Sequence, residues 1–166
     1  MLTYKNLWDN HPTISGNESP CSTNDVVHFS DQCAIRFGVA LAKCGVNTAY
    51  IVGARHCWHH KKAQGHILAA QELAIGLSNQ PLGGMEKRQV IDPKNFKNLI
   101  ADKRGIIFFK DFWVRPNGHR SGDHIDLWNG SRLTDWKSWL RIQLGLSWDS
   151  TFSDFSRSAE VWFWEI

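Results

Sequence analysis

Apolar residues recur with a helical period in the N-terminal part of the chain and with strand-like patterns in the C-terminal part. The clearest helix runs from a cap at Ser30 or Asp31 to about Lys43, with Gly45 ending it. It is apolar on most of its circumference, which is typical of a buried helix. Further helical patterns are predicted at residues 4–8, at 64–78 and from Asp92 onward.

Strand patterns follow the helices. Gly105–Phe109 predicts a strand buried on both faces, and residues 122–127 alternate between polar and apolar. A short helix is expected near Trp136–Leu144, before a terminal strand at Val161–Ile166. Helices that precede hairpin-connected strands indicate an α+β fold around an antiparallel sheet.

The alternating segment leads into Asn129-Gly130, a strong predictor of a two-residue hairpin turn. If these are the two turn residues, His124 lies opposite Asp135, with Cβ atoms roughly 4.5–5.5 Å apart. A carboxylate at that distance can accept a hydrogen bond from one imidazole nitrogen and leave the other free as a base. Asp126 shares a face with His124 but is diagonal to it, so it ranks second as the orienting acid and is instead expected to contact substrate.

Cys33 is the candidate nucleophile for this base. A cysteine at a helix N-terminus has a lowered pKa because unpaired amides and the helix dipole stabilise the thiolate. The amides at the same helix start, those of Cys33 and Ala34, are the expected oxyanion donors. The residues therefore predict a Cys–His–Asp hydrolase. A lone cysteine at a helix start can equally be structural, and the pairing of His124 with Asp135 is what favours catalysis.

Composition limits the alternatives. The chain has 166 residues, of which 42% are hydrophobic, so we expect one domain over residues 1–166. It begins without the basic start and apolar run of a signal peptide, and it holds no apolar run near the ~20 residues of a membrane span. The net charge of +3 is scattered, so a nucleic-acid partner is not expected.

The four cysteines all lie within the first 57 residues and form no Cys-x-x-Cys pair, which argues against a zinc ribbon and against a thioredoxin-like redox site. A disulfide, for instance from Cys21 to Cys57, is possible. A dense group of histidines surrounds Cys57 but fits no familiar ligand spacing. We therefore predict a polar surface loop there, with no metal and no cofactor; its residues are His56, Cys57, His59, His60 and His66.

Nine tryptophans are unusual in a chain of this length. Most are expected to fill the core, whereas one or two can line a groove and stack on substrate. Trp113 and Trp128 flank the histidine segment and are the candidates for substrate contact.

Several motifs follow one another along nearly the whole chain: Asp31-Gln32-Cys33-Ala34-Ile35-Arg36, Gly105-Ile106-Ile107, Gly122-Asp123-His124-Ile125-Asp126-Leu127-Trp128-Asn129-Gly130, Asp135 and Val161-Trp162-Phe163. Together they resemble the fourth family of type VI secretion amidase effectors. The resemblance implies a papain-like fold of the NlpC type, in which a helix headed by the cysteine packs on an antiparallel sheet that bears the histidine. It assigns Cys33 as nucleophile, His124 as base and Asp135 as orienting acid.

The resemblance also implies a function. The expected reaction is hydrolysis of the γ-D-glutamyl–meso-diaminopimelate bond of peptidoglycan stem peptides. The expected route is export by the type VI secretion machinery from the cytoplasm, without a signal peptide, into the periplasm of a rival cell. A dedicated immunity protein is the expected inhibitor. The chain departs from the family pattern in two places: no cysteine follows Cys57 to hold the loop at about Arg141–Phe155, and residues 112–120 differ in detail.

Two other functions remain open at this point. The same three catalytic groups suit a cysteine peptidase or deamidase that acts on proteins. A non-catalytic wall-binding module could instead use its tryptophans as stacking surfaces.

Overall fold

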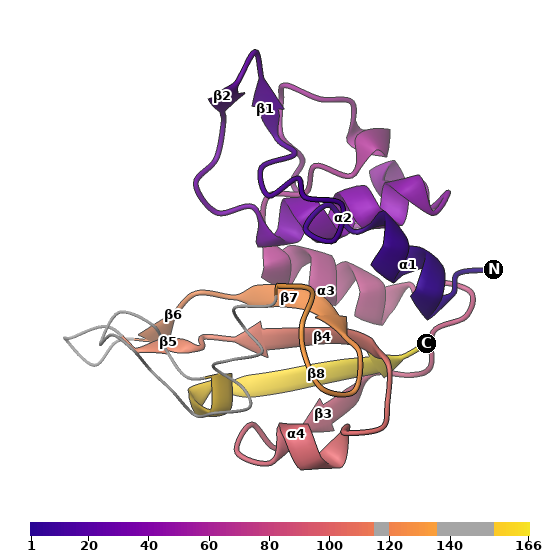
Figure 1. The fold of residues 1–166 in the computed structure, drawn as a ribbon, viewed down its shortest axis with the longest axis vertical. Coiled ribbons are helices and arrows are strands. Elements are labelled where there is room, and N and C mark those ends of the chain that lie inside the picture. Colours follow the sequence, from indigo (N-terminus) through magenta and orange to yellow (C-terminus); the bar gives the residue numbers. More distant parts are fainter. Residues whose placement is uncertain (115–119, 136–154) are drawn as a thin grey trace. The chain divides into compact units, whose positions relative to one another are not determined.

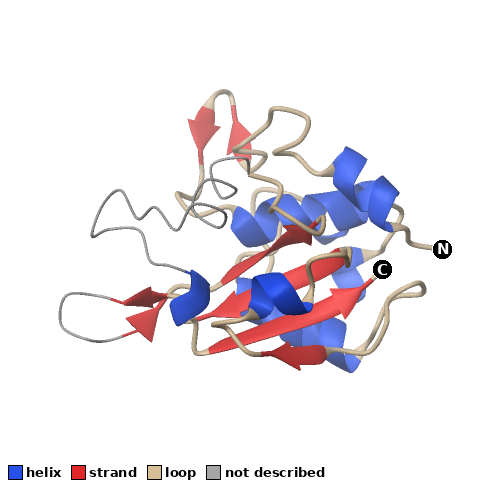
Figure 2. Cartoon of the chain, turned by 60° about the horizontal axis from the view of Figure 1, so that its bottom comes forward, coloured by secondary structure: helices blue, strands red, loops and turns tan. Residues whose placement is uncertain are grey.

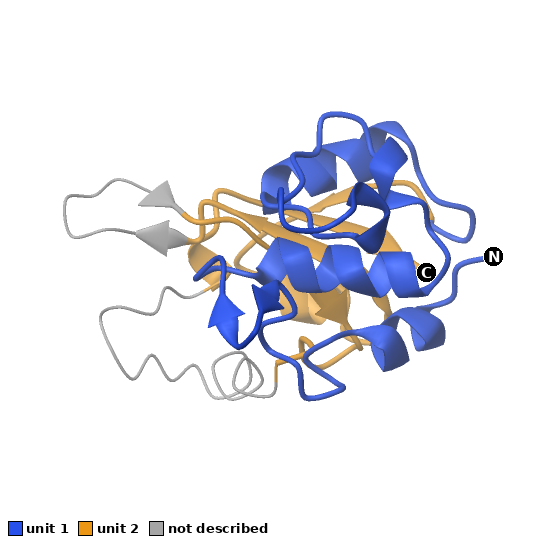
Figure 3. Cartoon of the chain, turned by 90° about the horizontal axis from the view of Figure 1, so that it is seen from above, with its two compact units in different colours: residues 1–85 blue, residues 86–166 orange. Residues whose placement is uncertain are grey.

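Helices gather in the first half of the chain and the main sheet in the second, as the hydrophobic pattern predicts (Figure 1). The structure is a computed structural model that describes residues 1–114, 120–135 and 155–166. It divides into two units, Met1–Met85 and Glu86–Ile166, coloured separately in Figure 3. Each unit is described by itself. The mixture of helices with antiparallel sheets, visible in Figure 2, confirms the α+β class. Within the described ranges, no helix has the length and apolarity to cross a membrane.

The first unit is built on three α-helices and one small hairpin. Thr3 caps the first helix by accepting a hydrogen bond from the amide of Asn6. The elements are α1 (Tyr4–Asn10), β1 (Ser22–Thr23), β2 (Val26–Val27), α2 (Cys33–Lys43), the 3-10 turns η1 (Thr48–Tyr50) and η2 (Lys62–Gln64), and α3 (Ala70–Asn79).

Helix α2 is the buried helix that the sequence predicts, and eight of its residues are buried. Gly45 follows its end with a φ of +83°. The amide of Gly45 donates to the Ala42 carbonyl and that of Val46 to the Leu41 carbonyl. This is the Schellman pattern, which satisfies the last carbonyls of a helix and favours glycine in the left-handed region. The predicted ending at Gly45 is therefore confirmed.

The helix predicted at residues 64–78 begins later than predicted. Residues 62–64 form the separate turn η2, which Gly65 ends with a φ of +84°. His56 and Ile67 then form an antiparallel bridge, flanked by hydrogen bonds from Cys57 N–H to the His66 carbonyl and from Leu68 N–H to the Arg55 carbonyl. Because residues 66–68 are extended and pair with residues 55–57, helix α3 begins only at Ala70.

Gly38 and Gly65 bring two backbones into direct contact inside this unit. A Cβ placed on Gly38, in the middle of α2, would lie 2.0 Å from the carbonyl oxygen of Gly65. A Cβ placed on Gly65 would likewise lie 2.0 Å from the carbonyl oxygen of Gly38. Only glycine at both positions permits this approach, which joins the segment after η2 to the middle of α2.

The second unit contains a four-stranded antiparallel sheet in the order β3-β8-β4-β7. Its strands are β3 (Gln89–Ile91), β4 (Gly105–Lys110), β7 (His124–Trp128) and β8 (Glu160–Glu165), accompanied by the short helix α4 (Phe96–Leu99), the two-stranded pair β5 (Trp113–Val114) and β6 (Arg120–Ser121), and the turn η3 (Phe155–Arg157). The predicted strands at residues 105–109 and 161–166 are confirmed. The predicted helix at 136–144 lies outside the described residues.

An aromatic core fills one face of this sheet. It contains Phe96 from α4, Phe109 from β4, Trp128 from β7 and Phe163 from β8, all at most 1% exposed. Phe96 meets the rings of Phe109 and Trp128 edge to face, with centroids 5.2 and 5.8 Å away. The Trp128 indole N–H donates to the Ile100 carbonyl at 2.8 Å, so this ring is held by a buried hydrogen bond as well as by packing.

Replacing Trp128 by phenylalanine is expected to lower the free energy of unfolding by about 1–3 kcal/mol, because the smaller ring leaves a gap in the core and the Ile100 carbonyl keeps only its hydrogen bond from the Lys103 amide. Urea denaturation followed by circular dichroism measures this. Trp58→Phe is the matched control: Trp58 is 74% exposed, so its stability should change by no more than about 0.5 kcal/mol. Equal losses in the two variants would contradict the importance of the hydrogen bond.

Candidate active site

Cys33 is the first residue of α2 and is 7% exposed, which confirms the predicted position at a helix start. The segment before it is fixed by the amide side chain of Gln32. Its Oε1 accepts from the Cys21 amide at 2.9 Å, and its Nε2 donates to the carbonyls of Cys21 at 3.3 Å and Phe29 at 3.1 Å. These contacts with backbone groups hold the entry to the helix in place.

The amides around Cys33 differ from the expectation in one respect. The Cys33 N–H donates to Oδ1 of Asp31 at 3.2 Å, so a carboxylate already occupies one expected oxyanion donor. The first helical hydrogen bond runs from Arg36 N–H to the Gln32 carbonyl. The amides of Ala34 and Ile35 therefore come before the helical ladder begins, where helix amides are available to an anion. Ala34 remains the better of the two predicted donors.

His124 is the first residue of β7, and its side chain is 19% exposed. The imidazole is flanked by the rings of Phe155, with centroids 5.5 Å apart, and Phe112, at 6.2 Å. Sequence reasoning missed both phenylalanines, because Phe155 lies far along the chain from His124 and carries no motif. Their packing restricts the imidazole and leaves it partly shielded from water.

Asp126 is the carboxylate that the structure places beside this histidine. Its Oδ2 lies 3.6 Å from His124 Nε2 on the same face of β7. Asp126 is buried and also accepts three hydrogen bonds: from Leu127 N–H at 2.7 Å, from Thr134 Oγ1 at 2.6 Å and from Thr134 N–H at 3.3 Å. The expectation that Asp126 contacts substrate is therefore wrong, since its oxygens point to groups inside the unit.

The predicted hairpin register is also wrong. His124 pairs with Phe109 of β4, and the described residues after Trp128 form a turn rather than a paired strand. Asn129 N–H donates to the Arg132 carbonyl, which centres the turn on Gly130 and Ser131, one residue later than predicted. The Asn129 side chain stabilises this turn by accepting from the amides of Ser131 and Arg132. Asp135 is half-buried and directly follows Thr134, the residue that Asp126 binds.

The two tryptophan candidates have different outcomes. Trp128 is 1% exposed and lies in the aromatic core, so its prediction as a substrate-binding residue is wrong. The side chain of Trp113 lies outside the described part of the chain.

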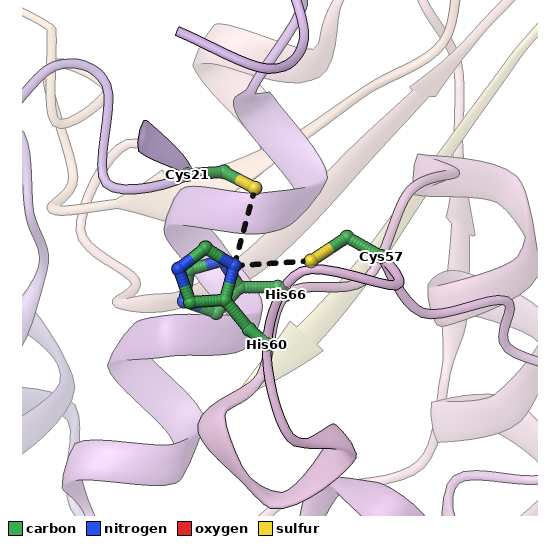
Figure 4. A group of neighbouring side chains, drawn as sticks. All are labelled: Cys21, Cys57, His60 and His66. Carbon is green, nitrogen blue, oxygen red and sulfur yellow. Dashed lines mark hydrogen bonds between the residues drawn. The ribbon is translucent and has the colours of Figure 1, made fainter. Parts of the chain in front are cut away.

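The histidine-rich segment also differs from its prediction as a polar surface loop. Cys57 and His66 are only 3% and 6% exposed, and Cys21, 36 residues earlier than Cys57, is fully buried beside them. Ligand atoms of Cys21, Cys57, His60 and His66 all lie within 4.8 Å of one another, a group shown in Figure 4. Cys33 belongs to the first unit together with this group, and His124 to the second.

Comparison with known proteins gives two matches. The family model for Tae4, the type VI secretion system (T6SS) amidase effector protein 4, matches residues 29–164. The chain is also similar to a chain in the structure of the effector–immunity system Tae4/Tai4 from Salmonella typhimurium. That match has a TM-score of 0.61 and 17% identity, and it covers 98% of this chain and 96% of the other. No curated protein matches. At this identity, the structural likeness establishes a shared fold.

Proposed function

The chain belongs to the amidase effector 4 family of type VI secretion, and from this premise we propose that Cys33, His124 and Asp135 carry out its reaction. The family confirms the resemblance given by the sequence motifs and makes the protein a peptidoglycan-degrading amidase effector, a DL-endopeptidase. The observation that most supports the assignment of residues is Cys33 at the first position of a buried helix. We propose that residues 1–166 act as a single amidase domain.

The proposed mechanism starts with transfer of the Cys33 thiol proton to His124. The thiolate attacks the carbonyl carbon of the γ-D-glutamyl–diaminopimelate amide, and the resulting oxyanion is stabilised by amides at the start of α2, including that of Ala34. His124 then protonates the leaving amine, and a thioester remains on Cys33. Water hydrolyses the thioester, releasing the D-glutamyl carboxylate and restoring the thiol.

In this proposal Asp135 and Asp126 have different roles toward His124. Asp135 accepts the hydrogen bond that orients the imidazole, as the family resemblance implies. Asp126 acts through position: its hydrogen bonds to Thr134 hold the backbone directly before Asp135. A buried carboxylate with three hydrogen bonds suits this anchoring role better than contact with substrate.

This division of roles predicts different outcomes for two amide variants. Asp135→Asn is expected to lower kcat about 10²–10⁴-fold, because the imidazole loses the acceptor that fixes its tautomer, and to leave stability nearly unchanged. Asp126→Asn should lower the free energy of unfolding by about 1–3 kcal/mol, because an amide cannot accept all three hydrogen bonds. Its activity should fall less, by about 10-fold. The readouts are kcat on muropeptides and the urea midpoint. Near-normal activity in Asp135→Asn with inactive Asp126→Asn would reverse the two roles.

The family also bears on location and partners. A type VI effector is a secreted protein, and we propose that this one acts in the periplasm of the target cell on peptidoglycan stem peptides, after delivery by the secretion machinery. The solved structure of Tae4/Tai4 is of an effector with its immunity protein. We therefore propose that a cognate immunity protein inhibits this chain.

The decisive experiment is mass spectrometry of Gram-negative peptidoglycan after digestion with the purified protein. Fragments that end at D-glutamate, with matching fragments that begin with a free diaminopimelate amine, are the expected products. Protein substrates are digested in parallel. Cleaved or deamidated proteins with intact stem peptides would favour the alternative peptidase or deamidase, and binding without new amines would favour a wall-binding module.

A further inference from the structure

We propose that Cys21, Cys57, His60 and His66 form a transition-metal site, best suited to one zinc ion, within the first unit. The function of Cys33 and His124 makes no use of these four residues. Zinc is bound tetrahedrally by combinations of cysteine sulfur and histidine nitrogen, and a set of two cysteines with two histidines is one of its common structural sites.

The ligand atoms have the spacing of such a site. Nδ1 of His60 lies 3.2 Å from Cys57 Sγ and 3.6 Å from Cys21 Sγ, and both sulfurs point toward it in Figure 4. With metal–sulfur distances of about 2.3 Å and metal–nitrogen distances of about 2.0–2.1 Å, tetrahedral geometry places neighbouring sulfur and nitrogen ligands roughly 3.6 Å apart. The ring of His66 lies against that of His60, with centroids 3.7 Å apart.

The local fold brings these ligands together without help from the metal. The pairing of residues 55–57 with 66–68 places Cys57 beside His66, because Cys57 N–H donates to the His66 carbonyl at 2.8 Å. His60 is three residues after Cys57 and reaches back over the same loop. Gln32 holds the backbone of Cys21 through both its amide and its carbonyl. A preassembled set of ligands loses little conformational entropy when it binds an ion.

A buried nitrogen of His66 also suits the binding of an ion. His66 is only 6% exposed, and its Nδ1 has no hydrogen-bond partner among the described residues. A neutral imidazole nitrogen is a common ligand of transition metals. An unsatisfied buried polar atom is costly unless an ion or water binds it.

The charge of the group suits a dipositive ion. Zinc would displace one proton from each of the two thiols, and the two thiolates would balance its charge. The resulting centre of Zn²⁺, two thiolates and two neutral imidazoles carries no net charge, which is the form that a buried site accommodates at least cost.

The test is the metal content of the full-length chain, purified without chelators through an affinity tag that contains no histidine. Native mass spectrometry and elemental analysis are expected to find about one zinc per chain, and Cys57→Ser and His60→Ala should each reduce this to below about 0.1. Cys44→Ser and His59→Ala are the matched controls, since both lie outside the group of four, and they should keep the zinc.

A second measurement covers the case in which a ligand variant fails to fold. Wild-type protein stripped of metal is titrated with Co²⁺, which should give the visible absorption of tetrahedral cobalt with a thiolate charge-transfer band. An unmetallated wild type after growth in zinc, an octahedral cobalt spectrum, or a Cys21–Cys57 disulfide in protein purified under reducing conditions would each overturn the proposal.

Discussion

Replacement of Cys33 by alanine is expected to lower peptidoglycan hydrolysis by about 10⁴-fold or more, to the level of the uncatalysed background. The loss is this large because nucleophile and base act as a unit in the proposed mechanism: without the sulfur, His124 has no proton to accept and no thioester can form. Folding should be little affected. Cys33 is 7% exposed at the first position of α2, and alanine is the best helix former. The measurement is the rate of release of diaminopimelate amines from sacculi.

Cys44→Ala provides the matched control for this variant. Cys44 belongs to the same helix as its C-cap residue and is half-buried, so it reports what loss of a cysteine at the other end of α2 does to the protein. Its activity should stay within about twofold of wild type. If folded Cys33→Ala retained substantial hydrolysis, another residue would have to be the nucleophile.

Gly38→Ala is expected to have the largest effect on stability, a loss of about 3 kcal/mol and a fall in Tm of roughly 10 °C. Two effects oppose each other here. Alanine is favoured over glycine inside a helix by about 1 kcal/mol. Its Cβ would lie 2.0 Å from the Gly65 carbonyl oxygen, a backbone atom that cannot rotate away as a side chain would. The steric term therefore exceeds the gain in helix propensity. Differential scanning calorimetry measures the shift.

Gly83→Ala is the control for the glycine substitution itself. A Cβ at Gly83 would meet no atom within 4 Å, so the only expected effect is a small change of about 0.5 kcal/mol from the less flexible unfolded chain. A stable Gly38→Ala protein would mean that α2 and the segment after η2 can separate without cost.

The sequence predicted those parts of the fold that depend on local patterns. The buried helix headed by Cys33, its ending at Gly45 and the central strand at residues 105–110 follow from apolar periodicity and backbone preferences. The prediction of the hairpin register was wrong, also for a local reason. The side chain of Asn129 accepts hydrogen bonds from the amides of Ser131 and Arg132, so the turn forms one residue later than the Asn-Gly pair indicates.

The group of two cysteines and two histidines could not be predicted by spacing. Cys57 and His60 are near neighbours, but the set becomes recognisable only when Cys21 joins it from a distant loop. Likewise, the phenylalanines beside His124 come together through the sheet and the turn η3, not through any motif. Trp128 illustrates the converse. Its place beside the histidine motif suggested substrate binding, whereas its side chain faces the aromatic core and is buried there.

The contacts of Gln32 have a consequence for how this protein can evolve. Its side chain binds only main-chain atoms of Cys21 and Phe29 and makes no use of their side chains. Residue 21 can therefore mutate while the loop that carries it keeps its anchor to the start of α2. Because Cys21 is fully buried in a cluster with Ile35 and Val39 of α2, only a small side chain can replace its thiol without disturbing that packing.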